Sequence, residues 1–144
     1  MKTRLIVTSF IEKDGKILMG QKPPGVGPYP DVWHNLGGGV ELEKETVDEA
    51  MKREVKEETN LDVDKLERVG FDEDYTENKH GEMCHYVFLI YKVTPTNMDA
   101  KAGDDIIKVK WFEKSEIKNL PLTTPAKKYI KKSACYNFLL SLTR

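Results

Sequence analysis

The sequence is poor in cysteine and almost free of net charge. Only Cys84 and Cys135 are cysteines among its 144 residues, and no set of closely spaced Cys and His pairs forms a zinc-binding pattern. Lys and Arg total 23 against 24 for Asp and Glu, which leaves a formal net charge of −1. Proteins held to nucleic acid by charge carry an excess of basic residues, so this balance argues against a nucleic-acid partner.

Long apolar runs are also missing. Residues 5–11 are mostly apolar, but Thr8 and Ser9 interrupt them and no small-residue cleavage site follows, so we expect no signal peptide. Apolar residues make up 39% of the chain and charged residues 33%, which excludes a membrane span and a disordered chain. We therefore expect a reduced, soluble, cytoplasmic protein without a membrane partner, built as a single domain over residues 1–144.

The order of strand-like and helix-like segments predicts the fold class. Residues 86–91 are nearly all apolar, which is typical of a central strand covered on both faces. One helix is expected at residues 46–59, with Thr46 and Glu49 placed as a capping box, and another starts at Thr124-Pro125. This order predicts an α/β sandwich around a mixed sheet. The expected strands are residues 4–12, 16–22, 61–75, 83–93 and 109–112, and the proline-rich residues 23–30 are expected to form a surface loop.

The helix at residues 46–59 has charged residues where a purely structural helix has apolar ones. At about 100° per residue, its apolar stripe consists of Val47, Ala50, Met51 and Val55. Glu54 and Glu58 continue this stripe, and Glu57 lies at its edge. Buried carboxylates are costly unless they meet a cation. The spacing i, i+3, i+4 also crowds like charges on one face, so we expect a positive group there.

Three carboxylates that converge near the end of a helix are hard oxygen ligands, which suit Mg²⁺ or Mn²⁺. Acidic clusters on helices are often simply solvated, and for Glu57 alone this interpretation is favoured. For Glu54 and Glu58 together, in line with the apolar stripe, we favour a bound cation. Upstream, the triplet at residues 37–39 is all glycine, which lets the backbone approach a metal or a phosphate closely. No Gly-Lys-Ser/Thr follows the triplet, so it is not a P-loop.

A motif around this helix resembles a known family. Gly39, Glu45 and the run Arg53-Glu54-Val55-Lys56-Glu57-Glu58-Thr59-Asn60-Leu61 are similar to the Nudix box, G-x5-E-x7-R-E-U-x-E-E-x-G-U with U apolar. The wider resemblance is to the MutT-like branch and extends from the first strands through Trp33 to Trp111-Phe112. It implies a Nudix-type α/β/α sandwich with a catalytic loop-helix-loop. It also implies an enzyme that hydrolyses nucleoside diphosphates linked to another group, using Mg²⁺ or Mn²⁺ and water.

The resemblance carries roles over to individual residues. Glu54, Glu57 and Glu58 match the metal ligands of the family. Arg53 matches the arginine that orients one of these glutamates, and Glu45 matches the glutamate that supports the loop-helix-loop. Glu57, Glu58 or an acid from a later loop would accept the proton of the attacking water.

Two departures from the family pattern affect these assignments. Asn60 replaces the last glycine of the box, and asparagine is the next best residue for a left-handed helix cap. The segment between Glu41 and Glu45 is one residue longer than usual, so the box glycine is Gly39 by the formal pattern but Gly38 when counted from the upstream tryptophan. The backbone carbonyl that joins the metal ligands would accordingly come from Gly38 or Gly37.

Residues outside the box suggest the substrate class. The layout is most similar to MutT-like enzymes that convert a (deoxy)nucleoside triphosphate to the monophosphate and pyrophosphate, so a small-molecule nucleotide is the expected partner. Tyr29 and Trp33 could stack on a base, but packing within the loop explains them equally well. Asp104 and Asp105, which we call the late aspartate pair, are equally explained by a plain turn after a glycine. The candidate substrate contacts are Tyr29, Trp33, Gly37, Gly39, Asp104 and Asp105.

Two other functions are alternatives to this one. An ADP-ribose or nucleotide-sugar pyrophosphatase is one, although the proline that marks ADP-ribose hydrolases is not found at residues 76–78. A non-catalytic Nudix domain that senses a nucleotide is the other, but such domains often lose a box glutamate and all of them are present here. The enzyme is therefore favoured. A homodimer is an alternative that the sequence leaves open.

Overall fold

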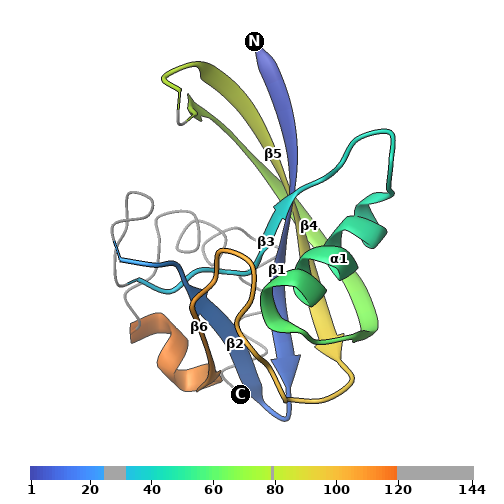
Figure 1. Ribbon diagram of the computed structural model, residues 1–144, viewed down its shortest axis with the longest axis vertical. Coiled ribbons are helices and arrows are strands. Elements are labelled where there is room, and N and C mark those ends of the chain that lie inside the picture. The colour runs from blue at the N-terminus through green and yellow to red at the C-terminus, as the bar shows by residue number, and fades with distance from the viewer. Residues whose placement is uncertain (25–31, 79, 120–144) are drawn as a thin grey trace.

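The computed structural model describes residues 1–24, 32–78 and 80–119, and its centre is a mixed β-sheet with one helix on its face (Figure 1). The strand order is β4-β5-β1-β2-β6, and β3 pairs with β1 beside that path. Only the β1–β5 pair is parallel among the strand pairs of these residues. The strands are β1 (Lys2–Lys13), β2 (Lys16–Gln21), β3 (Gly37–Gly39), β4 (Val63–Glu77), β5 (Met83–Pro95) and β6 (Lys108–Glu113).

Strand β1 organises the sheet because three other strands pair with it. One edge of β1 runs parallel to β5, from Lys2 opposite Cys84 to Ile11 opposite Val93. The other edge is shared by β3 and then β2, which both run antiparallel to β1. In this register Val7 lies opposite Gly38, so the glycine triplet is part of the sheet rather than a free turn.

The apolar strand predicted to be central is β5, and its position between β4 and β1 confirms that part of the prediction. It is not covered on both faces along its whole length, because residues 85–89 are only half-buried. A turn closed by the Asn78 side chain, which accepts hydrogen bonds from the main-chain N–H groups of His80 and Glu82, connects β4 to β5. The pairing is irregular between Arg68 and Gly70, where β4 has an extra residue. Such bulges bend a strand and increase its twist.

Helix α1 (Val47–Thr59) begins and ends at the residues that the sequence indicates. The Thr46 hydroxyl accepts a 3.1 Å hydrogen bond from the N–H of Glu49, and the Glu49 carboxylate accepts one from the N–H of Thr46. This reciprocal capping box satisfies two N–H groups that have no partner inside the helix. At the other end Asn60 adopts the left-handed conformation, with φ of 61°, and its N–H caps the carbonyl of Lys56.

The hydrophobic core lies between α1 and the sheet. Met51 and Val55 are fully buried on the inner face of the helix, and each contributes about 1.5–3 kcal/mol relative to an exposed position. The core cluster consists of Val7, Ile11, Leu18, Leu36, Ala50, Met51, Val55, Leu61, Tyr91, Val93 and Ile106. The predicted α/β fold around a mixed sheet is therefore confirmed.

The chain continues from β6 into a short 3-10 helix, η1 (Lys114–Asn119). The helix expected from Thr124, Cys135 and most of the expected proline-rich loop lie outside the described residues. Cys84 is buried and has a free thiol. Within the residues that the structure covers, no helix combines the length and the apolar character needed to cross a bilayer.

Candidate active site

The two glutamates in line with the apolar stripe of α1 are buried. Glu54 is 8% exposed and Glu58 is 4% exposed, whereas Glu57 faces solvent. Both buried carboxylates point toward β3, which the pairing with β1 places beside the last turns of α1. The periodicity of the sequence therefore predicts correctly which carboxylates are turned inward.

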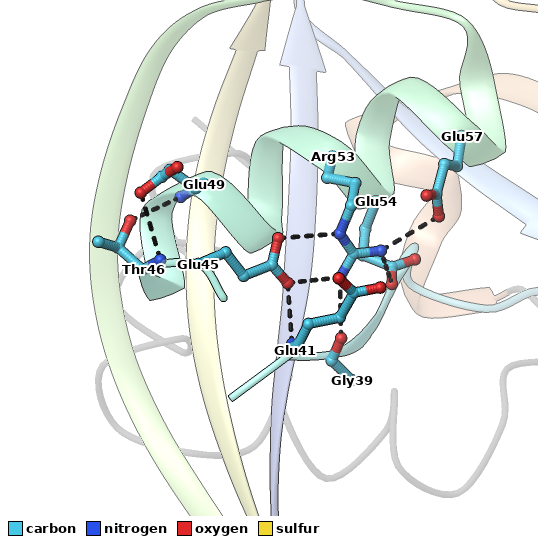
Figure 2. A network of polar contacts seen from close by, with 8 residues as sticks. All are labelled: Gly39, Glu41, Glu45, Thr46, Glu49, Arg53, Glu54 and Glu57. Carbon is cyan, nitrogen blue, oxygen red and sulfur yellow. Dashed lines mark hydrogen bonds and ion pairs between the residues drawn. The ribbon is translucent and has the colours of Figure 1, made fainter. Parts of the chain in front are cut away.

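Arg53 stands at the centre of a polar network on the solvent side of these carboxylates (Figure 2). Its Nε and Nη2 donate hydrogen bonds of 2.9 and 2.7 Å to the two oxygens of Glu45, a bidentate pair. Nη2 also donates to the carbonyl oxygen of Gly39 at 3.0 Å. Nη1 donates to Glu54 at 2.9 Å and to Glu57 at 3.2 Å. One guanidinium thus connects the loop before α1, the end of β3 and two carboxylates of the helix.

Glu45 holds the loop that leads into α1. It accepts hydrogen bonds from Arg53 and from the N–H of Glu41, and these two interactions lower the pKa of Glu45 to about 2. The hydrogen bonds from Arg53 to Glu45, and then the one to Glu54, raise the pKa of Arg53, so the guanidinium stays charged. The pair joins residues eight positions apart and fixes the loop against the helix.

The glycine triplet makes close contact with both buried carboxylates. The N–H of Gly37 donates a 2.8 Å hydrogen bond to Oε1 of Glu58. A Cβ atom at Gly38 would lie only 2.5–2.7 Å from the carboxylate atoms of Glu54. Glycine is therefore required at position 38 for Glu54 to occupy this place. Gly37 thus contacts Glu58, and Gly38 contacts Glu54.

The electrostatics of this pair show a deficit of positive charge. Burial, and then the neighbouring charge of Glu54, raise the pKa of Glu58 to about 8 despite the hydrogen bond from Gly37. Burial also raises the pKa of Glu54, although the bond from Arg53 opposes that rise. Two acids whose ionised forms are disfavoured in the fold are stabilised by a bound cation.

The late aspartate pair lies at this same site. The charges of Asp104 and Asp105 both raise the pKa of Glu58, and that of Asp104 also raises the pKa of Glu54. The preceding residue, Gly103, donates its N–H to the carbonyl of Glu58 at 3.1 Å. The pair is thus part of a turn, and its charges act on the two buried glutamates.

Trp33 is packed into the protein beside this region. Its ring is 8% exposed and meets Phe112 edge-on at a centroid distance of 4.8 Å, while the ammonium of Lys108 lies 5.7 Å from the ring centre. This geometry favours the packing interpretation of Trp33. Tyr29, the other aromatic candidate, lies outside the described residues.

The identity of the fold follows from comparison with known proteins. A family model described as "NUDIX domain" matches residues 2–133. The chain belongs to the NUDIX domain family. It is a MutT-like Nudix hydrolase. The motif that resembles the Nudix box lies on α1 and the loop before it.

Individual relatives agree with this assignment. "Nucleoside triphosphatase NudI" of Escherichia coli O81 (strain ED1a) is 26% identical over 138 residues, which cover 91% of this chain and 96% of that protein. The MutT NUDIX hydrolase of Burkholderia pseudomallei has the same fold, with a TM-score of 0.73 at 22% identity over 89% of this chain and 95% of its own. So does the NUDIX domain of Shewanella oneidensis NrtR, solved with ADP ribose, with a TM-score of 0.70 at 18% identity over 91% and 84%.

The arrangement of donors in this Nudix hydrolase fits a divalent cation, although the carboxylates do not converge fully. In the described ranges, no three Asp, Glu, His or Cys side chains already form a metal-binding group. The reason is visible in the contacts: Arg53 holds Glu54 and Glu57 from the solvent side, and Gly37 holds Glu58 from the other. Hard oxygen donors with excess negative charge, beside a glycine that lets the Glu54 carboxylate approach the main chain, suit a hard cation.

Two features of the site were not predicted from the sequence. Lys22, at the end of β2, places its Nζ 3.6 Å from an oxygen of Asp105, and no local pattern marks it. The main chain of residues 101–103 contacts the end of α1 through N–H groups, which any residue other than proline provides. In the sequence, only Gly103, directly before the aspartate pair, hinted at a close contact of this main chain.

Proposed function

We propose that this Nudix hydrolase converts a nucleoside triphosphate to the monophosphate and pyrophosphate with the help of Mg²⁺ or Mn²⁺. The observation that carries the metal dependence is the buried pair Glu54 and Glu58. Burial raises the pKa of both side chains, and neighbouring carboxylates add to the rise, that of Glu54 for Glu58 and that of Glu57 for Glu54. The substrate class is supported by the NudI relatives, which are named nucleoside triphosphatases and align over nearly their whole length.

The ligand set that we propose consists of Glu54, Glu57 and Glu58 with the carbonyl oxygen of Gly38. Gly38 is preferred to Gly37 because it lies directly against the carboxylate of Glu54. When bound, a divalent cation neutralises the polyphosphate and lowers the pKa of a bound water. The exposed Glu57 joins by turning from Arg53, to which it is held by a single 3.2 Å bond.

Arg53 and Glu45 position the ligands rather than binding the cation themselves. The bidentate bond to Glu45 fixes the plane of the guanidinium, and Nη1 then holds the carboxylate of Glu54 at 2.9 Å. Fixed partners of this kind orient ligands and typically change metal affinity or activity by about 10–100-fold when removed.

The proton of the attacking water goes to a carboxylate of the same helix. Glu57 and Glu58 are the two candidates, because each carries an oxygen at the site and both are preserved in the box. A positioned base of this type contributes about 10²–10⁴-fold to the rate. Around them, Gly37, Gly39 and the pair Asp104–Asp105 border the place that the polyphosphate would occupy.

A second substrate class belongs in the same assay. The NUDIX domain of NrtR, which shares the fold, was solved with ADP ribose, so a nucleoside diphosphate linked to a sugar is the alternative substrate. Both classes contain a phosphoanhydride next to a nucleoside, and the residues that hold the phosphates would be shared. The products distinguish them, because only a triphosphate yields pyrophosphate.

The experiment is a substrate panel with and without Mg²⁺. We expect one or more nucleoside triphosphates to yield monophosphate and pyrophosphate, detected by chromatography, and EDTA to abolish the release. Glu57→Gln and Glu58→Gln should each lower the rate by about 10²–10⁴-fold. Rapid cleavage of ADP ribose alone would replace the substrate assignment. No turnover of any nucleotide, or unchanged rates in both variants, would contradict the catalytic proposal.

A further inference from the structure

Strand β4 has an extra residue where it passes the first turn of α1. Arg68 lies opposite Tyr91 of β5 and Gly70 lies opposite Ile90, so Val69 has no residue of its own opposite it in β5. A bulge of this kind disrupts the ladder locally and changes the direction of the neighbouring side chains. Here it borders a cavity of about 300 Å³ between β4, β5 and the start of α1, which we call the bulge cavity.

The lining of the bulge cavity is mostly apolar. It includes Val47, the first residue of α1, together with Val69, Phe71 and Leu89 of the two strands. Phe71 is 71% exposed, so part of this apolar lining faces solvent rather than the core. Exposed apolar groups that line a hollow mark binding sites more often than scattered ones do. The volume lies at the lower end of the range for small-molecule sites, about 300–1,000 Å³, so the cavity suits the apolar part of a small ligand.

Of the lining residues that the structure describes, only Arg68 is charged. Its Nε and Nη2 donate hydrogen bonds of 3.2 and 3.3 Å to the two carboxylate oxygens of Asp48, in the first turn of α1. Asp48 also accepts a 2.7 Å hydrogen bond from the hydroxyl of Tyr91 in β5. Arg68 is therefore held at the cavity by a carboxylate that is itself bound to the sheet.

The pair with Asp48 leaves part of the Arg68 guanidinium available for a ligand. An arginine side chain has five N–H groups, and a carboxylate binds it along one edge with two parallel hydrogen bonds. Asp48 takes two of the five, along the Nε–Nη2 edge. The Tyr91 hydroxyl also interacts with Arg68, and even a bond to it leaves two N–H groups for another acceptor. Because the Arg68 side chain is 71% exposed, an anion can reach these groups from solvent.

Attachment of α1 to the sheet does not require all of these features. The hydrogen bond from Tyr91 to Asp48 already joins the helix to β5. It uses neither the apolar hollow nor the exposed ring of Phe71. A guanidinium fixed beside an apolar hollow matches a molecule that has an apolar body and an anionic group.

We propose that the bulge cavity binds a small ligand with an apolar, ring-sized body and a carboxylate. The body lies against Val69 and Leu89, and the carboxylate binds the edge of Arg68 that faces away from the helix. The site is separate from the box glutamates, because it lies at the start of α1, and Figure 2 shows Thr46 and Glu57 at opposite ends of this helix. The inference goes beyond the proposed function and does not depend on it.

Hydrocinnamate is the probe, because it joins a phenyl ring to a carboxylate through a short chain. It is added in EDTA to isotope-labelled protein, and binding is followed by the amide NMR signals. We expect the signals of Val69, Gly70 and Phe71 to shift with a Kd of about 1–5 mM, as is usual for a ligand this small, while those of Gly37 and Gly38 stay in place. No shift at residues 69–71, or larger shifts at the glycine triplet, would overturn the proposal.

The uncharged amide of the same molecule tests the role of Arg68. Hydrocinnamamide keeps the shape and lacks the charge, so it should bind about fivefold more weakly, a modest difference because Arg68 is exposed. Arg68→Gln should bind the acid as weakly as the amide. Lys16→Gln is the matched control, since it also removes an exposed cation from an ion pair, in this case with Glu113. Equal wild-type affinity for acid and amide, or the same loss in Lys16→Gln, would overturn the assignment of a carboxylate to Arg68.

Filling the cavity tests where the apolar body lies. Val69→Phe places a ring in the hollow from a residue that is not paired with β5, and it should weaken the binding of both probes by about tenfold or more. Thermal denaturation checks that the variant is folded. If it is not, Val47→Phe fills the same cavity from α1. Unchanged affinity in the folded variant would contradict the proposal.

Sedimentation velocity tests the alternative that a second copy of the chain covers the cavity. We expect Phe71→Ser to leave the sedimentation coefficient of the protein unchanged. A wild-type dimer that Phe71→Ser dissociates would overturn the proposal of a small ligand, because the exposed ring and the cavity beside it would then lie in a protein interface.

Discussion

The main-chain N–H of Gly37 donates a 2.8 Å hydrogen bond to the carboxylate of Glu58. This bond connects β3 to the last turn of α1. It gives the Glu58 carboxylate a hydrogen-bond partner inside the protein, where Glu58 is only 4% exposed. The hydrogen bond offsets only part of the free-energy cost of burying an ionised carboxylate, because burial and the charge of Glu54 still raise the pKa of Glu58 to about 8. In the absence of a cation, the site therefore lowers the stability of the fold that carries it.

Replacing Glu58 with glutamine should separate stability from catalysis. Glutamine keeps an oxygen that accepts the Gly37 N–H, and it cannot ionise. In EDTA at neutral pH we expect the free energy of unfolding to rise by about 1–2 kcal/mol, because Glu58, with a folded pKa of about 8, must take up a proton when the chain folds, and glutamine removes that cost. Turnover should fall by about 10²–10⁴-fold. Thermal denaturation and pyrophosphate release measure the two effects, and a loss of stability would contradict the burial argument.

Gly38→Ala tests the close approach of β3 to Glu54. The new Cβ would lie 2.5–2.7 Å from the Glu54 carboxylate, which is the flexible end of a side chain and will swing away. We expect a folded protein whose turnover is about 10–100-fold lower, because a proposed ligand is displaced. The control is Gly81→Ala, with φ of 75° in an open turn, which should lose stability and keep its turnover. Equal turnover in the two variants would show that Gly38 has no special role.

Arg53→Lys tests whether the planar guanidinium is needed. An ammonium group cannot span Glu45, the Gly39 carbonyl and the Glu54 carboxylate at once, as Arg53 does. We expect turnover to drop by about 10–100-fold. This drop should occur in protein that is still folded at the assay temperature, as thermal denaturation checks. Arg68→Lys is the matched control, since Arg68 pairs with Asp48 in the first turn of the same helix. A lysine at position 53 with wild-type turnover would show that charge alone is sufficient.

Tyr91→Phe should lower stability in a pH-dependent way. The Tyr91 hydroxyl donates a 2.7 Å hydrogen bond to Asp48, and this bond, followed by that of Arg68, lowers the pKa of Asp48 below its ordinary 3.8. A carboxyl group with a lowered folded pKa stabilises the protein above pH 3.8, and the contribution is lost as the pH falls through the folded pKa. Asp48 is partly exposed, so we expect a loss of only about 1 kcal/mol at pH 7.

The same bond has an alkaline limit. Burial and the Asp48 carboxylate raise the pKa of Tyr91 to about 12, so its neutral form is favoured in the fold. On this alkaline side, the stabilisation that is present between about pH 4 and pH 10 is lost as the pH rises from about 10 to 12. Urea denaturation of wild type and Tyr91→Phe from pH 3 to 11 measures the difference. The same difference at pH 3 and pH 7 would show that the hydrogen bond to the ionised Asp48 is not the cause.

Helix α1 was predictable because its signals are local. The capping box at Thr46 and Glu49 and the cap at Asn60 are encoded within a few residues of each helix end. The inward direction of Glu54 and Glu58 follows from helix periodicity alone, and the structure confirms it. The box as a whole was recognisable for the same reason, since its charged positions share one short segment.

Features that depend on distant contacts were not predictable. Three consecutive glycines have low strand propensity, yet residues 37–39 form β3 because β1 supplies the hydrogen bonds. The bond from Tyr91 to Asp48 joins residues 43 positions apart, and neither residue type indicates the other. Gly103 looked like an ordinary turn glycine, and only its contact with Glu57 shows why no side chain fits.

The parallel pairing of β1 with β5 has a consequence for synthesis of the chain on the ribosome. Each β1 residue from Lys2 to Ile11 pairs with one 82 positions later, as Lys2 does with Cys84. At about 5–20 residues per second, the edge of β1 waits about 4–16 s for its partner to be made. During that time a strand rich in Ile, Val and Phe exposes unpaired backbone groups, which is a hazard for aggregation. The strand that later holds the glycine triplet beside the buried glutamates thus keeps one edge unpaired during synthesis until β5 has been made.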